Sequence, residues 1–301
     1  MGNPSFAIPT LKALLKSHHN VVAVVSNPIK RIGRNNKKSL TPVGNFAVKN
    51  NITNINPDSL KSEGFRKKIA LTKADIFIVV AYKILPSSLI NIPKYGSLNL
   101  HASLLPKYRG AGPIQWALMN GDKITGVTIF QIKRKVDTGN ILFQKRVTIK
   151  RDDNMQTLGM RLCEIGADSM LSVLKNIEDK KVDSSPQNSD GISLAPKITK
   201  EMLIINWSWA AKKIHNWIRG LSPYPGMHTF LKNKKVRIFK TKVIEGLGEK
   251  GVIVRLDKKN CIIGTGDQLI SILEIQLEGK KKMNIRDFLI GSTFKKGNVL
   301  G

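Results

Sequence analysis

Short runs of apolar, often β-branched residues alternate with segments of helical spacing through the first half of the chain. Asp75 to Ala81 (DIFIVVA) is the clearest such run, and Gly96 to His101 (GSLNLH) is the next. Runs of this length are typical of strands buried on both faces, as in a parallel sheet covered by helices. The pattern therefore predicts an α/β fold, closed by a long helix from Asn154 to Ile177. Further strands of this sheet are expected at Val21 to Val25, Val127 to Ile132 and Ile141 to Val147.

The pattern changes after a polar segment, Lys181 to Ile192, whose Pro and Gly residues are typical of a linker. An amphipathic helix over Trp209 to Ile218 comes next, and short strand-like pieces separated by Gly, Asn and Lys follow it. Short strands at such spacing predict a small barrel. We therefore expect a Rossmann-like parallel-sheet domain over residues 1–180, a linker over 181–200 and a small OB-like β-barrel domain over 201–301.

Positive charge dominates the composition. The 301 residues include 50 Lys and Arg but only 21 Asp and Glu, which gives a formal net charge of +29. Residues 193–301 hold 21 of the basic and 8 of the acidic side chains, a net charge of +13, so the C-terminal part is the denser one. This excess predicts a polyanionic partner, with nucleic acid as the first candidate. The alternative is lysine-rich drift, as in proteins from AT-rich genomes.

Several classes of protein are excluded. No apolar run approaches the roughly 20 residues that a bilayer-spanning helix needs, and the N-terminus lacks the pattern of a secretory signal, so we expect no membrane partner. The cysteines are Cys163 and Cys261 alone, which excludes a disulfide framework and a four-cysteine zinc site and favours a reducing compartment. We also expect no metal site at His18, His19, His215 or His228, since none has a ligand partner at useful spacing.

Candidate catalytic residues lie between Gly96 and Asn140. Asn99 and His101 are two positions apart on a predicted strand, so their side chains share a face at its carboxyl end, where open α/β sheets bind ligands. Asp137 lies in a turn before another strand and could hold a histidine's tautomer and charge. An Asn donor for an oxyanion, a His for proton exchange and an Asp to orient it suit acyl-group transfer. A lone His after a strand is more often structural.

A longer set of motifs is more specific. The segments NLHASLLP, RGAGPIQ, GDKITGVTI and DTG follow one another within Gly96 to Asn140. Together they resemble the folate-dependent formyltransferase family. The resemblance implies transfer of a formyl group from 10-formyltetrahydrofolate to an amine, with no metal. It implies a catalytic trio of Asn99, His101 and Asp137, and a folate site bordered by Ser103, Leu104, Leu105 and Pro106.

Two other regions resemble the branch of this family that formylates the α-amine of initiator methionyl-tRNA for translation initiation. INWS at Ile205 and the Pro-Tyr-Pro-Gly segment at Pro223 are similar to that branch's tRNA-binding C-terminal domain. The basic segment Pro28 to Leu40 takes the place of its acceptor-end loop, which implies tRNA contacts by Arg34, Lys37 and Lys38. We expect a monomer in the bacterial cytoplasm, with an organelle as the alternative.

Two rival functions stay open at this point. A formyltransferase acting on a small amine, such as glycinamide ribonucleotide or a nucleotide sugar, would keep the same trio but would not need a C-terminal part of net charge +13. The other rival is a non-catalytic RNA-binding protein on a decayed enzyme scaffold. It would keep the positive charge but would not catalyse formyl transfer.

One departure from the family concerns the start of the chain. Family members open with a strand that runs into Gly-Thr-Pro, and Met1 to Pro4 (MGNP) falls on the end of that strand. A strand of about 5–6 residues is therefore expected ahead of Met1, with the true start codon upstream. The genomic frame before Met1 would test this expectation.

Overall fold

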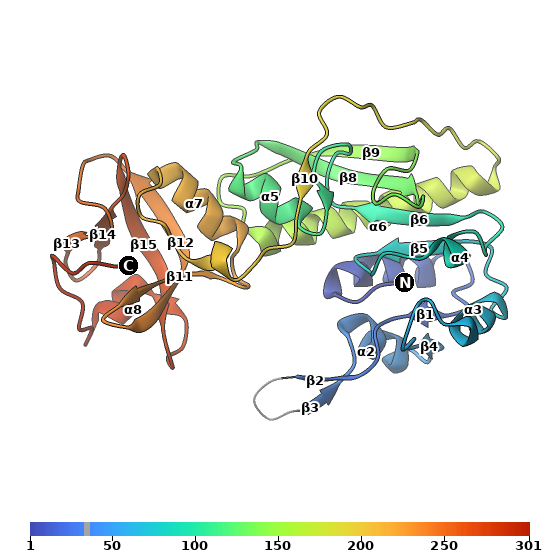
Figure 1. The fold of residues 1–301 in the computed structure, drawn as a ribbon, viewed down its shortest axis with the longest axis horizontal. Coiled ribbons are helices and arrows are strands. Elements are labelled where there is room, and N and C mark those ends of the chain that lie inside the picture. The colour runs from blue at the N-terminus through green and yellow to red at the C-terminus, as the bar shows by residue number, and fades with distance from the viewer. Residues whose placement is uncertain (33–36) are drawn as a thin grey trace. The chain divides into compact units, whose positions relative to one another are not determined.

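The computed structural model describes residues 1–32 and 37–301. Contacts divide the chain drawn in Figure 1 into two units. The first unit consists of Met1–Pro113, Ile124–Thr148 and Gly159–Ala195. The second consists of Ile114–Lys123, Ile149–Leu158 and Pro196–Gly301, so it takes two short pieces from the middle of the chain. The domain limits expected from the sequence, with a linker over 181–200, stay a prediction.

Strands and helices alternate through the first unit. Its helices are η1 (Ser5–Ala7), α1 (Ile8–Lys16), α2 (Pro42–Lys49), α3 (Glu63–Ala70), α4 (Ser87–Ile90) and most of α6 (Met155–Glu178). Its strands are β1 (Val24–Val25), β2 (Lys30–Ile32), β3 (Lys37–Ser39), β4 (Asn54–Ile55), β5 (Phe77–Val80), β6 (Ser97–His101), β7 (Arg109–Gly110), β8 (Ile124–Gln131), β9 (Ile141–Thr148) and β10 (Leu194–Ala195). This α/β architecture is the one that the alternating pattern predicts.

The main sheet has the order β5-β6-β8-β9. Strands β5 and β6 are parallel, as predicted, whereas β8 runs antiparallel to β6 and β9 antiparallel to β8. The last two strands therefore depart from the parallel sheet expected from their apolar runs. The connection explains the direction of β9: residues 132–140 form a hairpin link between β8 and β9, and a parallel crossover needs a dozen or more residues.

Helices cover both faces of β5 and β6. On one face, Gly166 of α6 lies against Leu100 of β6 so closely that an added Cβ would be 2.6 Å from a leucine methyl carbon. On the other face, Phe77 and Val79 of β5 belong to a buried cluster with side chains of α3 and α4, among them Phe65, Ile69 and Leu89. Burial on both faces explains why β5 reads as a continuous apolar run.

The N-terminal end of the sheet is split. Strands β1 and β4 form a separate parallel pair, and among the described residues the backbone hydrogen bonds between this pair and β5 run through Met1 and Gly2. Gly2 N donates to Val25 O at 3.0 Å, and Val80 N donates to Met1 O at 2.9 Å. A cavity of about 760 Å³ extends from this junction between β1 and β5. The expectation of a further strand ahead of Met1 stays a prediction.

The second unit is built around an antiparallel sheet of order β11-β12-β15-β14-β13, with β16 paired to β15. Its strands are β11 (Met227–Leu231), β12 (Lys234–Ile244), β13 (Ile253–Leu256), β14 (Cys261–Gly264), β15 (Leu269–Leu277) and β16 (Met283–Asn284). Its helices are α5 (Pro113–Met119, nearly all within this unit), η2 (Glu201–Leu203), α7 (Ala211–Gly220) and α8 (Ile285–Leu289). No pairing between β11 and β13 closes the sheet in the residues that the structure describes.

The core of this unit is rich in fully buried isoleucine. Ile214 and Ile218 project from α7 one turn apart and meet Ile238, Ile270 and Ile272 of the sheet. This spacing places the two helix residues on one face, as the amphipathic pattern predicts. Within residues 1–32 and 37–301, no helix is both long and apolar enough to cross a membrane.

Candidate active site

Strand β6 positions the first two candidate residues. Asn99 pairs in register with Val79 of β5 on one side and Phe130 of β8 on the other, so it lies in the interior of the sheet. His101 is the last residue of the strand and is buried, while Asn99 is half-buried. Because successive strand residues alternate between faces, both side chains lie on one face, and Leu98 and Leu100 lie on the opposite one. The shared face agrees with the strand pattern read from the sequence.

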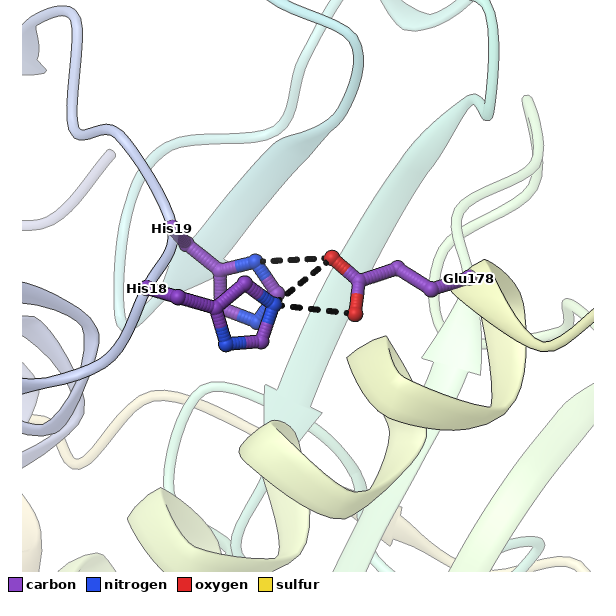
Figure 2. A group of neighbouring side chains, drawn as sticks. All are labelled: His18, His19 and Glu178. Atoms are coloured by element: carbon purple, nitrogen blue, oxygen red, sulfur yellow. Dashed lines mark hydrogen bonds and ion pairs between the residues drawn. The ribbon is translucent and has the colours of Figure 1, made fainter.

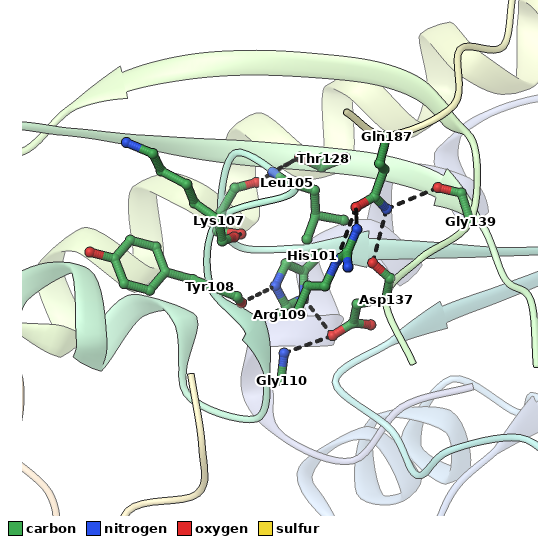
Figure 3. A network of polar contacts seen from close by, with 11 residues as sticks. His101, Leu105, Lys107, Tyr108, Arg109, Gly110, Thr128, Asp137, Gly139 and Gln187 are labelled. Carbon is green, nitrogen blue, oxygen red and sulfur yellow. Dashed lines mark hydrogen bonds and ion pairs between the residues drawn. The ribbon is translucent and has the colours of Figure 1, made fainter. Parts of the chain in front are cut away.

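His101 is held between two segments that follow it in the chain. Its Nε2 lies 2.8 Å from Tyr108 O, and its Nδ1 lies 3.9 Å from Asp137 Oδ2 (Figure 3). A carbonyl only accepts hydrogen bonds, so the contact to Tyr108 places a proton on Nε2. In the neutral ring Nδ1 is then an acceptor, and a second acceptor, the Asp137 carboxylate, stands 3.9 Å away. Protonation of Nδ1 would turn this contact into an ion pair.

Asp137 is fixed from two directions. Gly110 N donates to its Oδ2 at 2.8 Å, and Gln187 Nε2 donates to its backbone carbonyl at 2.9 Å. The same Gln187 amide also donates to Gly139 O at 2.9 Å. Gln187 Oε1 in turn accepts from Arg109 Nη2 at 2.6 Å (Figure 3). The turn that carries Asp137 is therefore held by residues from two other segments.

A close backbone approach requires glycine at position 110. Its φ is +124°, and a Cβ there would be 2.7 Å from Ala195 O. The two residues are register partners in the short parallel pairing of β7 with β10. Since a side chain would clash and strain the backbone, only glycine lets the Gly110 N–H reach Asp137.

Side chains of β8 and β9 hold the backbone of the segment Ser103 to Pro106 by hydrogen bonds. Thr128 Oγ1 donates to Ser103 O at 2.6 Å and accepts from Leu105 N at 3.1 Å. Gln144 Nε2 donates to Leu105 O at 2.7 Å. Ser103 and Leu105 are buried, whereas Leu104 and Pro106 are partly exposed. The segment thus presents two apolar side chains on a backbone that is held by hydrogen bonds at Ser103 and Leu105.

The structure brings only part of the expected set together. Asn99, His101 and Asp137 lie around the end of β6, and Ser103 to Pro106 follow that strand directly. Arg34 lies outside the described residues. Lys37 and Lys38 lie in β3, which pairs antiparallel with β2.

Sequence reasoning missed two features. Gln187 lies in the segment expected to be a linker, and nothing in its local pattern signals a contact with Asp137. Nor does the local pattern around His18 and His19 signal that both imidazoles contact the carboxylate of Glu178.

Comparison with known sequences gives matches along almost the whole chain. The profile of the family described as "Formyl transferase" matches residues 1–174, and that of "Formyl transferase, C-terminal domain" matches residues 197–293. A methionyl-tRNA formyltransferase from Caldanaerobacter subterraneus subsp. tengcongensis is 40% identical over 304 residues, which cover 100% of this chain and 98% of that protein. One from Thermodesulfovibrio yellowstonii is 41% identical over 297 residues, which cover 98% and 96% of the two chains.

Solved structures share the fold. WlaRD, a sugar 3N-formyl transferase crystallised in the presence of dTDP and 5-N-formyl-THF, has a TM-score of 0.68 at 20% identity and covers 93% of this chain and 97% of its own. HypX from Aquifex aeolicus in complex with tetrahydrofolic acid has a TM-score of 0.61 at 20% identity, with 85% and 47% covered. At such identities the likeness concerns the fold alone.

Proposed function

Since this chain belongs to the formyl transferase family, we propose that it transfers a formyl group from 10-formyltetrahydrofolate to the α-amine of initiator methionyl-tRNA. The observation that carries the chemistry is the placement of Asp137 Oδ2 at 3.9 Å from Nδ1 of the nearly buried His101. The observation that carries the acceptor is the match to methionyl-tRNA formyltransferases over the full length at 40% and 41% identity.

We assign the chemical steps to Asn99, His101 and Asp137. The methionyl amine attacks the formyl carbon, and a C–N bond forms while the carbonyl oxygen gains negative charge. The Asn99 amide donates to that oxygen; no hydrogen bond engages this amide in the described part of the chain. Such donors stabilise the charge most where they are already in place. His101 Nδ1 accepts the amine proton, and Asp137 stabilises the imidazolium that results. The bond to the folate nitrogen then breaks, and that nitrogen receives the proton.

Ser103 to Pro106 are our proposed border of the folate site. The fixed backbone of Leu105 and the partly exposed side chains of Leu104 and Pro106 give an apolar surface beside His101. An apolar surface with few mobile polar groups suits the rings of a pterin ligand. Binding there would place the formyl group near the end of β6.

Basic residues would hold the tRNA. We propose that Arg34, Lys37 and Lys38 contact its acceptor end and that the C-terminal part, with its net charge of +13, contacts its backbone. Contacts of this kind release counterions, so the affinity for tRNA should fall linearly on a plot of log K against log salt concentration. We also propose that the C-terminal sheet curves into an OB-like barrel. Because its substrates belong to translation initiation, we place the protein in the bacterial cytoplasm, as a monomer.

Formylation assays with the full chain test this proposal. We expect formyl-methionyl-tRNA to accumulate with 10-formyltetrahydrofolate as donor, and we expect the His101→Ala variant to produce almost none. Transfer to glycinamide ribonucleotide or an amino sugar nucleotide, without transfer to the tRNA, would overturn the acceptor. Binding of tRNA without transfer to any amine would overturn the enzymatic function.

A further inference from the structure

Two histidines and a glutamate from distant parts of the chain converge at one edge of the first unit. His18 and His19 follow α1 directly, and Glu178 is the last residue of α6. All three line the cavity between β1 and β5. Figure 2 shows the two imidazole rings side by side, with the Glu178 carboxylate facing both. These residues lie outside the site assigned to formyl transfer.

The donor atoms are close enough to share one ion. His18 Nε2 lies 3.0 Å from both carboxylate oxygens of Glu178, and His19 Nδ1 lies 3.2 Å from Oε1. The three ligand atoms all lie within 4.8 Å of one another. In a tetrahedral zinc site, bond lengths near 2.1 Å separate neighbouring ligand atoms by about 3.4 Å. The nitrogen–oxygen contacts would have to open by only a few tenths of an ångström to admit an ion.

The backbone presents the two rings in this arrangement. Ser17 caps α1, since its Oγ donates to Leu14 O at 2.6 Å and accepts from His19 N at 3.2 Å. His19 is mostly buried, with 19% of its side chain exposed, whereas His18 is 72% exposed. One ligand is therefore fixed by packing, and the other is free to adjust to an ion.

Electrostatics also favour a cation at this place. Glu178 ends a helix, where the negative end of the helix dipole makes a carboxylate unfavourable and a cation favourable. Among the described residues, Glu178 forms ion pairs only with the two imidazoles. A divalent ion would satisfy the carboxylate, both ring nitrogens and the helix end together.

We propose that His18 Nε2, His19 Nδ1 and the Glu178 carboxylate bind a Zn²⁺ ion, with water as the fourth ligand. Two imidazoles and a carboxylate form a ligand set that zinc accepts in tetrahedral geometry. Harder ions such as Mg²⁺ prefer all-oxygen ligands, so they should not compete. The ion would tie the end of α1 to the end of α6 at the edge of the cavity and would stabilise the first unit.

The cysteines do not offer a rival site. Burial raises the pKa of the Cys163 thiol to about 11 and that of the Cys261 thiol to about 12. Both thiols are therefore protonated at neutral pH, and neither belongs to a group of three potential metal ligands in the described residues. A zinc ion bound by the full chain at neutral pH can thus be assigned by changing the histidines and the glutamate.

Calorimetric titration of the metal-stripped full chain with ZnCl₂ tests the proposal. We expect one Zn²⁺ per chain, a melting temperature that rises with zinc but not with MgCl₂, and the visible absorption of tetrahedral Co²⁺ on cobalt substitution. His19→Ala and Glu178→Gln should each weaken zinc binding by at least about tenfold, the loss that even outer-shell partners cause. These readouts do not depend on catalytic activity.

Glu164→Gln is the matched control, because it removes an exposed carboxylate from the same helix. We expect it to bind zinc as the unchanged chain does. Absence of a stoichiometric site in the unchanged chain would overturn the proposal and leave a cluster of hydrogen bonds only. Equal affinity in Glu178→Gln and the unchanged chain would overturn it as well.

Discussion

The first unit contains two regions built from similar buried strands but organised differently. Around His101, at the end of β6, backbone and side-chain groups from β7, the 132–140 link and the segment near residue 187 are hydrogen-bonded to one another. Between β1 and β5, by contrast, the backbone hydrogen bonds among the described residues run through Met1 and Gly2, and a cavity of about 760 Å³ lies beside them. Thr10 Oγ1 lines that cavity and has no hydrogen-bond partner among the described residues.

The region around His101 is held in one geometry for the reaction. The region between β1 and β5 is where substitutions can change the stability of the unit. A site whose groups are already positioned needs little reorganisation during reaction, so losses there should appear in rate. A strand pair linked to its neighbour by few backbone hydrogen bonds should open at a lower free energy, so changes there should appear in stability. Substitutions can separate the two effects.

The largest effect is expected at His101. His101→Ala removes the proton acceptor and should lower kcat/KM for formyl transfer by about a thousandfold, within the usual range for general acid–base catalysis. Initial rates with methionyl-tRNA and 10-formyltetrahydrofolate measure this loss. Circular dichroism and the melting temperature must show that the variant is folded, because the ring is buried. A folded variant that keeps most of its activity would contradict the role given to His101.

Asp137→Asn should have the next largest effect. The amide oxygen could still accept from Gly110 N, so the turn should keep its shape while the charge beside His101 is lost. We expect kcat to fall by about a hundredfold with little change in KM, since the imidazolium loses its counter-charge. The matched control is Asp183→Asn, an exposed aspartate that should behave as the unchanged chain. Equal losses in both variants would refute a specific role for Asp137.

The cavity can be tested by filling it. A segment of five apolar residues joined ahead of Met1 could pair with β1 and β5, and should raise the melting temperature by about 5 °C or more if it adds some 2 kcal/mol of apolar burial. Amide hydrogen exchange should slow in β1 and β5. The control is a segment of five alternating Gly and Ser residues, which has little apolar surface. Equal stabilisation by both segments would show that the cavity does not select an apolar strand.

Gln187 should act through Asp137 rather than on the substrate. Gln187→Ala removes the hydrogen bonds to the carbonyls of Asp137 and Gly139 and releases Arg109. We expect kcat to fall by about tenfold, a change that corresponds to roughly 1.4 kcal/mol. In the double variant with Asp137→Asn the two losses should not multiply. Fully multiplicative losses would mean that Gln187 acts independently of Asp137.

Local sequence patterns predict which side chains share a face of one strand. They do not predict which distant segments contact one another in the folded unit. The face shared by Asn99 and His101 follows from the two-residue period of a strand, and the strand at β5 follows from its apolar run. The contact between Gln187 and Asp137 joins positions 50 residues apart, and that between Glu178 and His18 joins positions 160 apart. Such contacts depend on how whole elements pack. The sequence around a polar residue in a linker-like segment does not indicate which residue it will contact.

A further effect is expected from pH, through the amine of Met1. Its nitrogen donates to Ile78 O at 2.6 Å, and burial lowers its pKa to about 5 from an ordinary value of 8.0. The unfolded chain therefore takes up this proton first as the pH falls below 8, so the free energy of unfolding should decrease from pH 8 to pH 5 and level off below pH 5. Acetylation of the amine removes the titrating group but keeps an N–H for Ile78. The melting temperature of the acetylated chain should thus fall less between pH 8 and pH 5 than that of the free chain. Identical pH profiles would show that the proton on this amine does not weaken the junction between β1 and β5.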